Sequence, residues 1–336
     1  MTIRRKRVRA ITYDRFGPAK DVLKLEDLPI PKPGPGEVLV RLKASGVNPS
    51  DIRARAGGRP GVTKPPFPKI IPHSDGAGII EAVGDERLHS RIGERVWIWN
   101  GQWRRAYGTA ADYIAVPAEQ AVRLPDHVSF ETGAIFGIPA LTATQAVLGA
   151  GPVDGKTILV SGGAGTVGRL AVQIAVASGA RVIATAHGAQ NIEAAQSAGA
   201  SAVLDYRSTS LAQDILAVTD GAYVDHVVEV EFGKNIDVLT QVIAEHGRIV
   251  TYGSAQAMTP TLPFYPLLFK AVSIDLVLVY LLNQRERTRA IDQLNALLER
   301  GVMDFRVSQK LSLEDCARAH EIIEAGQRAG SIVLTM

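Results

Sequence analysis

The spacing of hydrophobic and polar positions changes along the chain. Residues 1 to about 126 carry short β-like runs, such as EVLVRLKASGV and GAGIIEAVG, which Pro and Gly clusters interrupt. This punctuation predicts a β-barrel-like domain. From about Thr157 to Gly253, apolar strand-like runs alternate with helix-like ones. That alternation predicts an α/β domain with a doubly wound parallel sheet.

Further runs extend the predicted order of elements. The first strand is expected near Val8 to Tyr13, and the strands of the parallel sheet are TILV, RVIATA, AVLDY, VDHVVEV and RIVTYGS. After them come the apolar run VSIDLVLVY, a helix from about Arg285 to Arg300, and a terminal strand, SIVLTM. A second helix is expected to begin at Ser312, because the Ser312 hydroxyl and the Asp315 carboxylate have the spacing of a capping box.

Composition narrows the class of protein. A chain of 336 residues that is 46% hydrophobic and 21% charged is long enough for two domains with substantial cores. Its single cysteine, Cys316, excludes an intrachain disulfide and fits a reducing compartment, so we expect a cytoplasmic protein. A secretory signal core and an apolar run of about 18 residues are both missing from the sequence, and we therefore expect no membrane partner.

The net charge of +3 depends on one basic cluster, because Arg4, Arg5, Lys6, Arg7 and Arg9 contribute five of the positive charges. Such a cluster either binds nucleic acid or forms a solvated tail that leads into the first strand. The cluster is short and has no aromatic residues for base stacking. We therefore expect no nucleic-acid partner.

A glycine motif follows the first strand of the parallel sheet. In SGGAGTVG, Gly162, Gly165 and Gly168 stand three residues apart, between the strand TILV and a predicted helix. In that context the first glycine allows a tight turn, the second allows backbone N–H groups to approach a pyrophosphate, and the third allows close helix–strand packing. The alternative is a glycine-rich turn with no ligand.

The next strand indicates which dinucleotide is bound. Sites for NAD usually place Asp or Glu at the end of this strand, where it accepts a hydrogen bond from the ribose 2′-hydroxyl. Here the residues are VIATAHGAQ, which include His187 and no carboxylate. Tyr206 and Arg207 follow the third strand, where they can bind a 2′-phosphate, although Arg207 could also be only solvated. The sequence therefore predicts NADPH.

Several motifs together resemble the medium-chain dehydrogenase/reductases, in particular the zinc-free quinone oxidoreductase branch, which is zeta-crystallin-like. The resemblance covers nearly the whole chain and is carried by GVNPSDIRARAG, PHSDGAGIIEAVG, IGERVW, AIFGIPALTATQAV, the glycine motif, HGRIVTYGS and RAHEII. It implies a GroES-like catalytic domain over 1–126, a Rossmann domain that binds NADPH over 127–271, a C-terminal segment over 272–336 that returns to the catalytic domain, and a homodimer.

The resemblance also implies which residues hold the cofactor. Ala164, Gly165, Thr166 and Val167 would touch the pyrophosphate, and Gly253 and Ser254 would lie beside the nicotinamide ribose. The wall near the carboxamide would be formed by Leu278, Val279 and Tyr280. Some bacterial relatives carry a phosphate-binding lysine where this chain has Asn191, a difference that weakens the expected preference for NADPH over NADH.

Zinc ligands are missing where zinc-dependent relatives have them. Those relatives use Cys where Asn48 stands and Glu next to the His, where this chain has Ser74. Only His73 is retained, and one imidazole without thiolates does not make a zinc site. We therefore expect no metal site, with His73 as a structural or cleft histidine.

The catalytic positions also follow from the resemblance. Asn48 and Asp51 would lie at the mouth of the nicotinamide site, and Arg53 stands where many relatives have a substrate-facing tyrosine. Arg53 either stabilises charge on the oxygen of the acceptor or excludes bulky quinones. Alternatively it points into solvent or pairs with Asp51.

These observations predict an NADPH-dependent reductase that transfers a hydride to quinones or related conjugated carbonyls without zinc. The cofactor supplies the hydride, and the protein aligns the rings and stabilises developing charge. One alternative is an enoyl or 2-alkenal reductase. An alternative of another class is a non-catalytic protein that binds NADPH or RNA, for which the basic N-terminal cluster is the only support.

Overall fold

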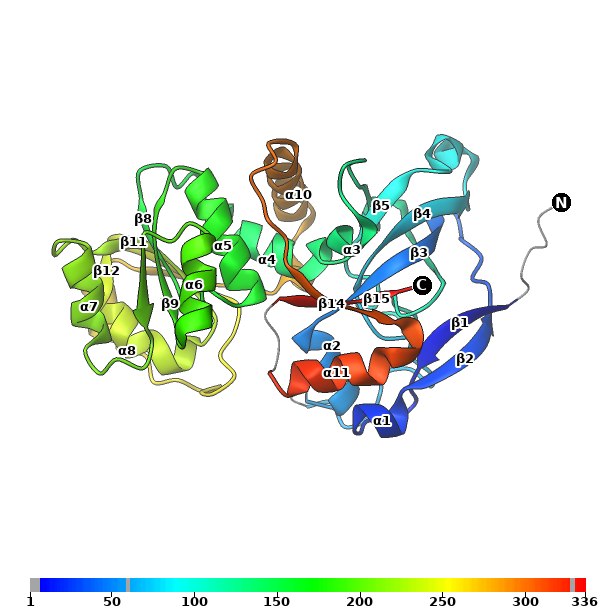
Figure 1. The fold of residues 1–336 in the computed structure, drawn as a ribbon, viewed down its shortest axis with the longest axis horizontal. Coiled ribbons are helices and arrows are strands. Elements are labelled where there is room, and N and C mark those ends of the chain that lie inside the picture. Colours follow the sequence, from blue (N-terminus) through cyan, green and yellow to red (C-terminus); the bar gives the residue numbers. More distant parts are fainter. Residues whose placement is uncertain (1–6, 59–60, 327–329) are drawn as a thin grey trace. The chain divides into compact units, whose positions relative to one another are not determined.

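The computed structural model describes residues 7–58, 61–326 and 330–336 and divides into two compact units (Figure 1). The first unit consists of Met1–Ile138 and Arg306–Met336, and the second of Pro139–Phe305. Three members of the basic cluster, Arg4, Arg5 and Lys6, lie outside the described residues.

The boundaries of these units differ from the predicted 1–126, 127–271 and 272–336. The first unit extends to residue 138 because α3 (Phe130–Gly133) packs against strands of the barrel. The second unit extends to residue 305 because β13 (Ser273–Leu276) pairs with the parallel sheet and α10 (Gln284–Glu299) packs against α4 (Leu141–Leu148). The C-terminal return to the catalytic domain therefore begins at Arg306 and not at residue 272.

The second unit is built on a six-stranded, wholly parallel sheet in the order β10-β9-β8-β11-β12-β13. Besides β13, its strands are β8 (Thr157–Val160), β9 (Arg181–Ala186), β10 (Ala202–Asp205), β11 (Val224–Glu229) and β12 (Ile243–Thr251). This order is that of a dinucleotide-binding fold, which places ligands at the carboxyl ends of the strands.

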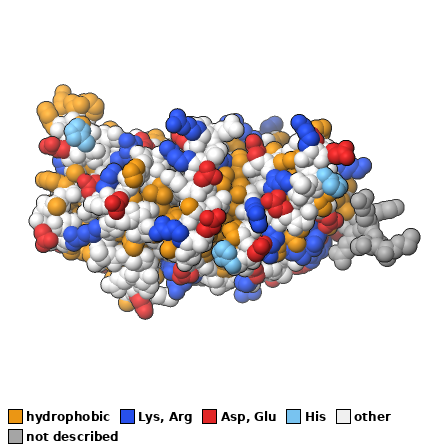
Figure 2. Space-filling model, turned by 90° about the horizontal axis from the view of Figure 1, so that it is seen from above, with side chains coloured by type: hydrophobic (Ala, Val, Ile, Leu, Met, Phe, Trp, Pro, Cys, Tyr) orange, Lys and Arg blue, Asp and Glu red, His pale blue; other side chains and the backbone are white. Residues whose placement is uncertain are grey.

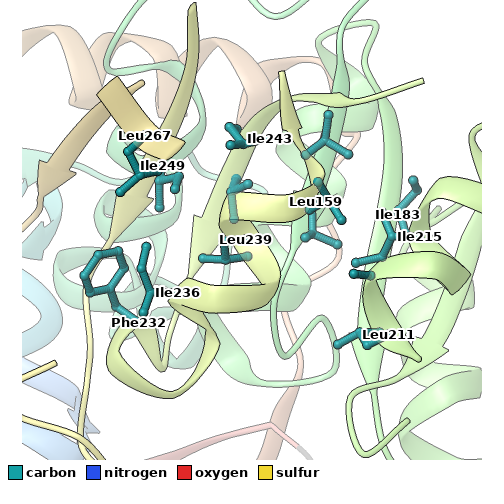
Figure 3. Packing of buried hydrophobic residues seen from close by; sticks show 14 residues of the cluster. Leu159, Ile183, Leu211, Ile215, Phe232, Ile236, Leu239, Ile243, Ile249 and Leu267 are labelled. Carbon is teal, nitrogen blue, oxygen red and sulfur yellow. The ribbon is translucent and has the colours of Figure 1, made fainter. Parts of the chain in front are cut away.

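Helices follow the strands in alternation. They are α5 (Thr166–Ala177), α6 (Ala189–Ser197), α7 (Leu211–Val218), α8 (Phe232–Val242) and α9 (Phe264–Phe269). Figure 3 shows Ile236 and Leu239 of α8 packed near Leu159 and Ile249 of the sheet, within one buried cluster. Burial of each such side chain contributes about 1.5–3 kcal/mol, so this cluster holds α7, α8 and α9 against the sheet.

The first unit contains a mainly antiparallel sheet in the order β14-β15-β3-β4-β5-β7, with β6 paired to β3 and a separate β1-β2 pair. Its strands are β1 (Arg7–Thr12), β2 (Lys24–Pro29), β3 (Glu37–Val47), β4 (Asp75–Val83), β5 (Arg95–Ile98), β6 (Tyr113–Pro117), β7 (Ala121–Arg123), β14 (Val307–Ser312) and β15 (Ser331–Thr335). Its other α-helices are α1 (Ala19–Val22), α2 (Pro49–Ala56) and α11 (Cys316–Glu324). Because β15 pairs with β3, the C-terminal segment joins the sheet that β3 to β7 form.

Short helical turns complete the chain. Among the residues that the structure describes, four are 3₁₀ turns, at Glu86–Arg91, Ala118–Gln120, Val279–Leu281 and Leu313–Asp315. A π-helical segment spans Phe136–Ala140 and contains Pro139.

The expected helix start at Ser312 is wrong in detail. Ser312 precedes the 3₁₀ turn Leu313–Asp315, and α11 begins at Cys316. The Ser312 hydroxyl donates a hydrogen bond to the Asp315 carboxylate at 2.8 Å and makes no side-chain cap. The two side chains satisfy each other, so this pair does not form the predicted capping box.

Two described residues of the basic cluster have partners within the first unit. Arg9 forms ion pairs with Asp112 at 2.9 Å and with Glu314 at 2.6 Å, and the Arg7 guanidinium donates to the Asp27 carbonyl. Within the described residues, every helix is too short or too polar to cross a membrane.

Candidate functional site

The glycine motif lies where the parallel sheet predicts it, between β8 and the first turn of α5. Gly162 has a φ of +67°, and a Cβ on Gly168 would lie 2.2 Å from the Gly162 carbonyl oxygen. A side chain at either position would therefore disrupt the turn. A Cβ on Gly165 would meet only that same oxygen, at 3.3 Å. The loop is therefore open at the position expected to approach the pyrophosphate.

The start of α5 is suited to bind an anion. Gly165 is the N-cap and provides no capping side chain, and the first turn carries no acidic residue. Ala164, Thr166 and Val167 are partly exposed around it. The N–H groups and positive potential of such a helix end attract phosphate. These residues fit a bound dinucleotide pyrophosphate.

A carboxylate lies at the end of β9 after all, and it comes from the neighbouring strand. Asp205 is opposite Ala186 in the parallel register of β10 and β9, and its carboxylate lies 2.9 Å from Nδ1 of His187. The segment Val182 to Gln190 has no carboxylate of its own, but Asp205 brings one to this edge from β10. Only the register of β9 and β10 reveals that neighbour, and the residues of β9 alone do not.

His187, Tyr206 and Arg207, the residues predicted to bind the 2′-phosphate half of the cofactor, lie at this edge. The rings of His187 and Tyr206 lie 5.8 Å apart, and the Arg207 side chain is exposed. Hydrogen bonds from the Arg207 backbone N–H and from His187 lower the pKa of Asp205. Asn191 donates its side-chain N–H to the His187 carbonyl at 2.9 Å. The edge thus presents an imidazole, a phenol and a guanidinium around one anionic carboxylate.

The ends of β8, β11 and β12 are joined by a buried polar network. Glu229 accepts hydrogen bonds from the Ser161 hydroxyl at 2.5 Å and from the Asn235 side chain at 3.0 Å, and the burial of Glu229 raises its pKa.

The loop after β12 contains the two residues expected beside the nicotinamide ribose. A Cβ on Gly253 would lie 2.4 Å from the Val230 carbonyl oxygen. The Ser254 hydroxyl accepts from the Gly233 N–H at 2.9 Å and donates to the Ala257 carbonyl. Ser254 therefore supports its own loop in this structure.

The proposed carboxamide wall follows β13. The apolar run VSIDLVLVY forms a strand only as far as Leu276, and a 3₁₀ turn covers Val279–Leu281. Leu278 is exposed, whereas Val279 and Tyr280 are buried. Arg287 donates a hydrogen bond to the Val279 carbonyl at 2.6 Å, so the turn is fixed against α10.

In the first unit, Asn48 and Asp51 lie at the start of α2. The Asp51 carboxylate accepts from the Asn48 backbone N–H at 2.8 Å. The Asn48 side-chain amide donates to the Asp75 carboxylate at 2.9 Å, and the Ile138 N–H donates to the same oxygen at 3.0 Å. Burial, together with the Asp51 charge, raises the pKa of Asp75 well above its usual range. Sequence reasoning missed Asp75, although it directly follows Ser74.

Arg53 lies on the exposed side of α2. The Asp51 carboxylate, two residues earlier on the same helix, is buried and caps the helix. The guanidinium is exposed to solvent in this structure, which agrees with one of the alternatives left open by the sequence.

His73 lies in a separate buried cluster. Its Nε2 atom is 2.9 Å from Nε2 of His320 and 3.8 Å from the Cys316 sulfur. Burial lowers the pKa of His73 to about 3 and raises the pKa of the Cys316 thiol. The sequence expectation treated His73 alone, because a separation of 247 residues hides its neighbours on α11.

The comparisons with known proteins agree with this architecture. Residues 34–126 match a model described as "Alcohol dehydrogenase GroES-like domain", and residues 166–296 match one described as "Zinc-binding dehydrogenase". A quinone oxidoreductase of Pseudomonas aeruginosa is 31% identical over 98% of this chain and 99% of its own. This chain belongs to the quinone oxidoreductase family. The family lies within the medium-chain dehydrogenase/reductase superfamily, so the resemblance inferred from the motifs is confirmed.

Two further members of the superfamily are similar over their full lengths. The human quinone oxidoreductase is 29% identical over 100% of both chains. A mycobacterial protein solved in complex with NADPH has a TM-score of 0.85 and 28% identity, and it covers 98% of this chain and 100% of its own. The predicted fold class, a GroES-like domain with a Rossmann domain, is confirmed.

Proposed function

We propose that this protein is an NADPH-dependent reductase that transfers a hydride to quinones or related conjugated carbonyls without catalytic zinc. The full-length similarity to quinone oxidoreductases carries the proposal. The bound nicotinamide supplies the hydride, so the chemistry needs no nucleophile from the protein.

The side chains at the catalytic position support a reaction without zinc. A zinc site of this superfamily type needs thiolate or imidazole ligands. Position 48 instead has an amide, which donates a hydrogen bond to the Asp75 carboxylate at 2.9 Å. The amide nitrogen has no lone pair for a metal, and an amide oxygen is not among the usual zinc ligands, which are thiolate, imidazole and carboxylate. Asn48, Asp51 and Asp75 therefore fit a hydrogen-bonded wall better than a zinc site.

The second unit would hold the cofactor. The N-terminus of α5 would bind the pyrophosphate, and His187, Tyr206 and Arg207 would surround the 2′-phosphate. The three donors offset the nearby Asp205 charge, and the similar mycobacterial protein was solved with NADPH. Gly253, Ser254 and Leu278 would contact the nicotinamide half.

Arg53 is the residue we propose to stabilise negative charge on the acceptor oxygen. Arg53 is exposed on α2, at the position where the relatives' substrate-facing tyrosine is expected. A charged donor becomes more effective as charge builds on the oxygen, which is the requirement for transition-state stabilisation.

The exposed apolar side chains of the second unit support a homodimer. Strand β13 is an edge strand, and Leu276 on it is 79% exposed. The adjacent helix α9 exposes Phe264, Tyr265 and Phe269, and orange apolar side chains are prominent in Figure 2. Exposed edges and apolar patches of this kind are normally covered by a partner. We propose that a second copy covers them, in a cytoplasmic enzyme.

Turnover of NADPH with a panel of quinones and enones tests the proposed activity. A preference for enones over quinones would favour the alternative of an enoyl or 2-alkenal reductase.

A further inference from the structure

Three potential metal ligands that the proposed reaction does not use meet in the interior of the first unit. The donor atoms of His73, Cys316 and His320 all lie within 4.8 Å of one another, and each residue is at most 1% exposed. Cys316 and His320 are four residues apart on α11, so both project from one face of the helix. His73 approaches from the loop before β4, in a left-handed conformation with a φ of 75°.

The hydrogen bonds around His73 fix which of its nitrogens can bind a cation. The Thr109 hydroxyl donates to the Asp75 carbonyl at 2.6 Å, and Ser45 Oγ lies 2.8 Å from Thr109 Oγ1. Because the Thr109 proton is already used, the Ser45 proton points to Thr109 or to the Asp75 carbonyl, which lies 3.4 Å away, and in both cases away from His73. Ser45 Oγ is then an acceptor for the Nδ1–H of His73 at 3.0 Å. The Nε2 atom of His73 is therefore left with a lone pair directed at His320.

This arrangement is the usual one for a metal-binding histidine. A ligating imidazole normally donates its second N–H to a neighbouring oxygen, which fixes the tautomer and the ring orientation. Here Ser45 provides that oxygen. The Nε2 atoms of His73 and His320 lie 2.9 Å apart while the ring centroids are 5.2 Å apart, so the two rings meet through their Nε2 edges, and the Cys316 sulfur lies within 4.8 Å of both histidines' donor atoms.

The separations suit a three-coordinate ion. Bonds of about 2.0–2.3 Å to nitrogen and sulfur place ligand atoms about 3.5–3.8 Å apart in a trigonal site. The distance from His73 Nε2 to the Cys316 sulfur is 3.8 Å, whereas the distance between the two Nε2 atoms is 2.9 Å. Binding therefore requires only a small opening of the histidine pair.

Charge and softness select among the metals. One thiolate and two neutral imidazoles carry a charge of −1, so a monovalent cation gives a neutral site, whereas a divalent ion leaves a buried positive charge. Burial of an unpaired charge is costly. Cys316 also packs in an apolar cluster with Leu313, Ala319 and Ile332, and thiolate with imidazole is a ligand set that suits Cu(I).

We propose that His73, Cys316 and His320 form a buried trigonal site for Cu(I). Binding replaces the thiol proton, so an S–Cu bond forms, the S–H bond breaks and one proton is released to solvent, with no change in oxidation state. The proton that His320 Nε2 donates to His73 moves to Nδ1 of His320, so that both Nε2 lone pairs bind the ion and His320 stays neutral. The site does not include Asn48, so the ion would be structural and would not bind substrate. This proposal departs from the sequence expectation of no metal site.

The test uses the full-length protein and Cu(I) itself. Because the site is fully buried, the protein is prepared both from copper-supplemented cells and by refolding with one equivalent of Cu(I) under anaerobic conditions. A colorimetric Cu(I) chelator then competes for the ion. We expect each wild-type chain to retain about one Cu(I), and we expect equimolar Zn²⁺ to be lost to a chelator.

Variants separate a built site from adventitious binding. We expect Cys316→Ala to lose retention, and Ser45→Ala to lower the affinity for Cu(I) about 10–100-fold because the His73 tautomer is no longer fixed. His89→Gln, a change at an exposed histidine, should retain one ion. Circular dichroism establishes that each variant is folded.

Three results would overturn the proposal. The first is folded wild-type protein that retains no Cu(I) by either route, in which case the two imidazoles share only a proton. The second is folded Cys316→Ala that retains the ion as the wild type does. The third is stoichiometric Zn²⁺ in place of Cu(I).

Discussion

The side-chain amide of Asn48 donates a hydrogen bond to the buried carboxylate of Asp75 at 2.9 Å. The same carboxylate oxygen accepts from the Ile138 N–H. These contacts connect the start of α2, the first residue of β4 and the π-helical segment. A metal ligand at position 48 would have to break them, so the local structure favours chemistry without zinc.

The first prediction concerns zinc. Purified protein should contain much less than one zinc per chain, and its reductase activity should be unchanged in a zinc chelator, because an amide committed to Asp75 is not a zinc ligand. Elemental analysis and assays with and without chelator measure this. One tightly bound zinc per chain that is required for turnover would contradict the prediction.

The second prediction follows from the raised pKa of Asp75. A buried acid that keeps its proton in the folded state, but loses it near pH 4 when unfolded, makes stability fall as pH rises above about 4. The slope from this one group is at most about 1.4 kcal/mol per pH unit, and it ends where the folded protein also ionises.

Asp75→Asn removes that titration. We expect the free energy of unfolding of the wild type, relative to Asp75→Asn, to decline as pH rises from about 4 towards neutrality. Denaturant unfolding of both proteins across this range measures the difference. Parallel pH profiles would show that Asp75 ionises normally in the folded protein.

The third prediction is a preference for NADPH over NADH. If Arg207 binds the 2′-phosphate, Arg207→Ala should remove about 1–3 kcal/mol of that preference, with NADH affinity unchanged. Arg207→Lys retains the positive charge and should therefore keep part of the preference for NADPH. Titration calorimetry with both coenzymes tests this, and equal affinities in the wild type would refute the assignment of the coenzyme.

The fourth prediction separates Asp205 from Arg207. The Asp205 carboxylate lies 2.9 Å from His187 and repels a 2′-phosphate, so Asp205→Asn should increase the preference for NADPH, in the direction opposite to Arg207→Ala. The same titrations provide the measurement. If Asp205→Asn lowers the affinity for NADPH and for NADH equally, the carboxylate serves only to position the loop.

The fifth prediction concerns Arg53. Arg53→Ala should lower kcat/KM about 10–100-fold, which corresponds to about 1.4–2.7 kcal/mol, while the Kd for NADPH is unchanged. Arg53→Tyr should recover part of the loss. Single-turnover hydride transfer measures the chemical step directly, and an unchanged rate in Arg53→Ala would place the electrophile elsewhere, first at Asn48 and then at Tyr280.

Much of the fold could be predicted from local patterns. The alternation of apolar runs placed all the strands from β8 to β12, because buried parallel strands have a continuous apolar signature. The domain boundaries could not be placed as well, because β13 and α10 join the second unit through contacts that local sequence does not encode.

The site was predictable where its residues are close in sequence. The glycine motif and the end of β9 lie within 30 residues of each other. The position of Asp205 beside the end of β9 follows only from the register of β9 and β10. The approach of His73 to His320 follows only from the return of the C-terminal segment, in which β15 pairs with β3. Such long-range pairings depend on packing, and a residue pattern alone does not reveal them.

The most direct test of the proposed function is steady-state oxidation of NADPH in the presence of a zinc chelator, with small quinones and 2-alkenals as acceptors. We expect turnover with quinones that stops when NADPH is omitted and is unchanged by the chelator. A protein that binds NADPH but turns over none of these acceptors would contradict the proposal.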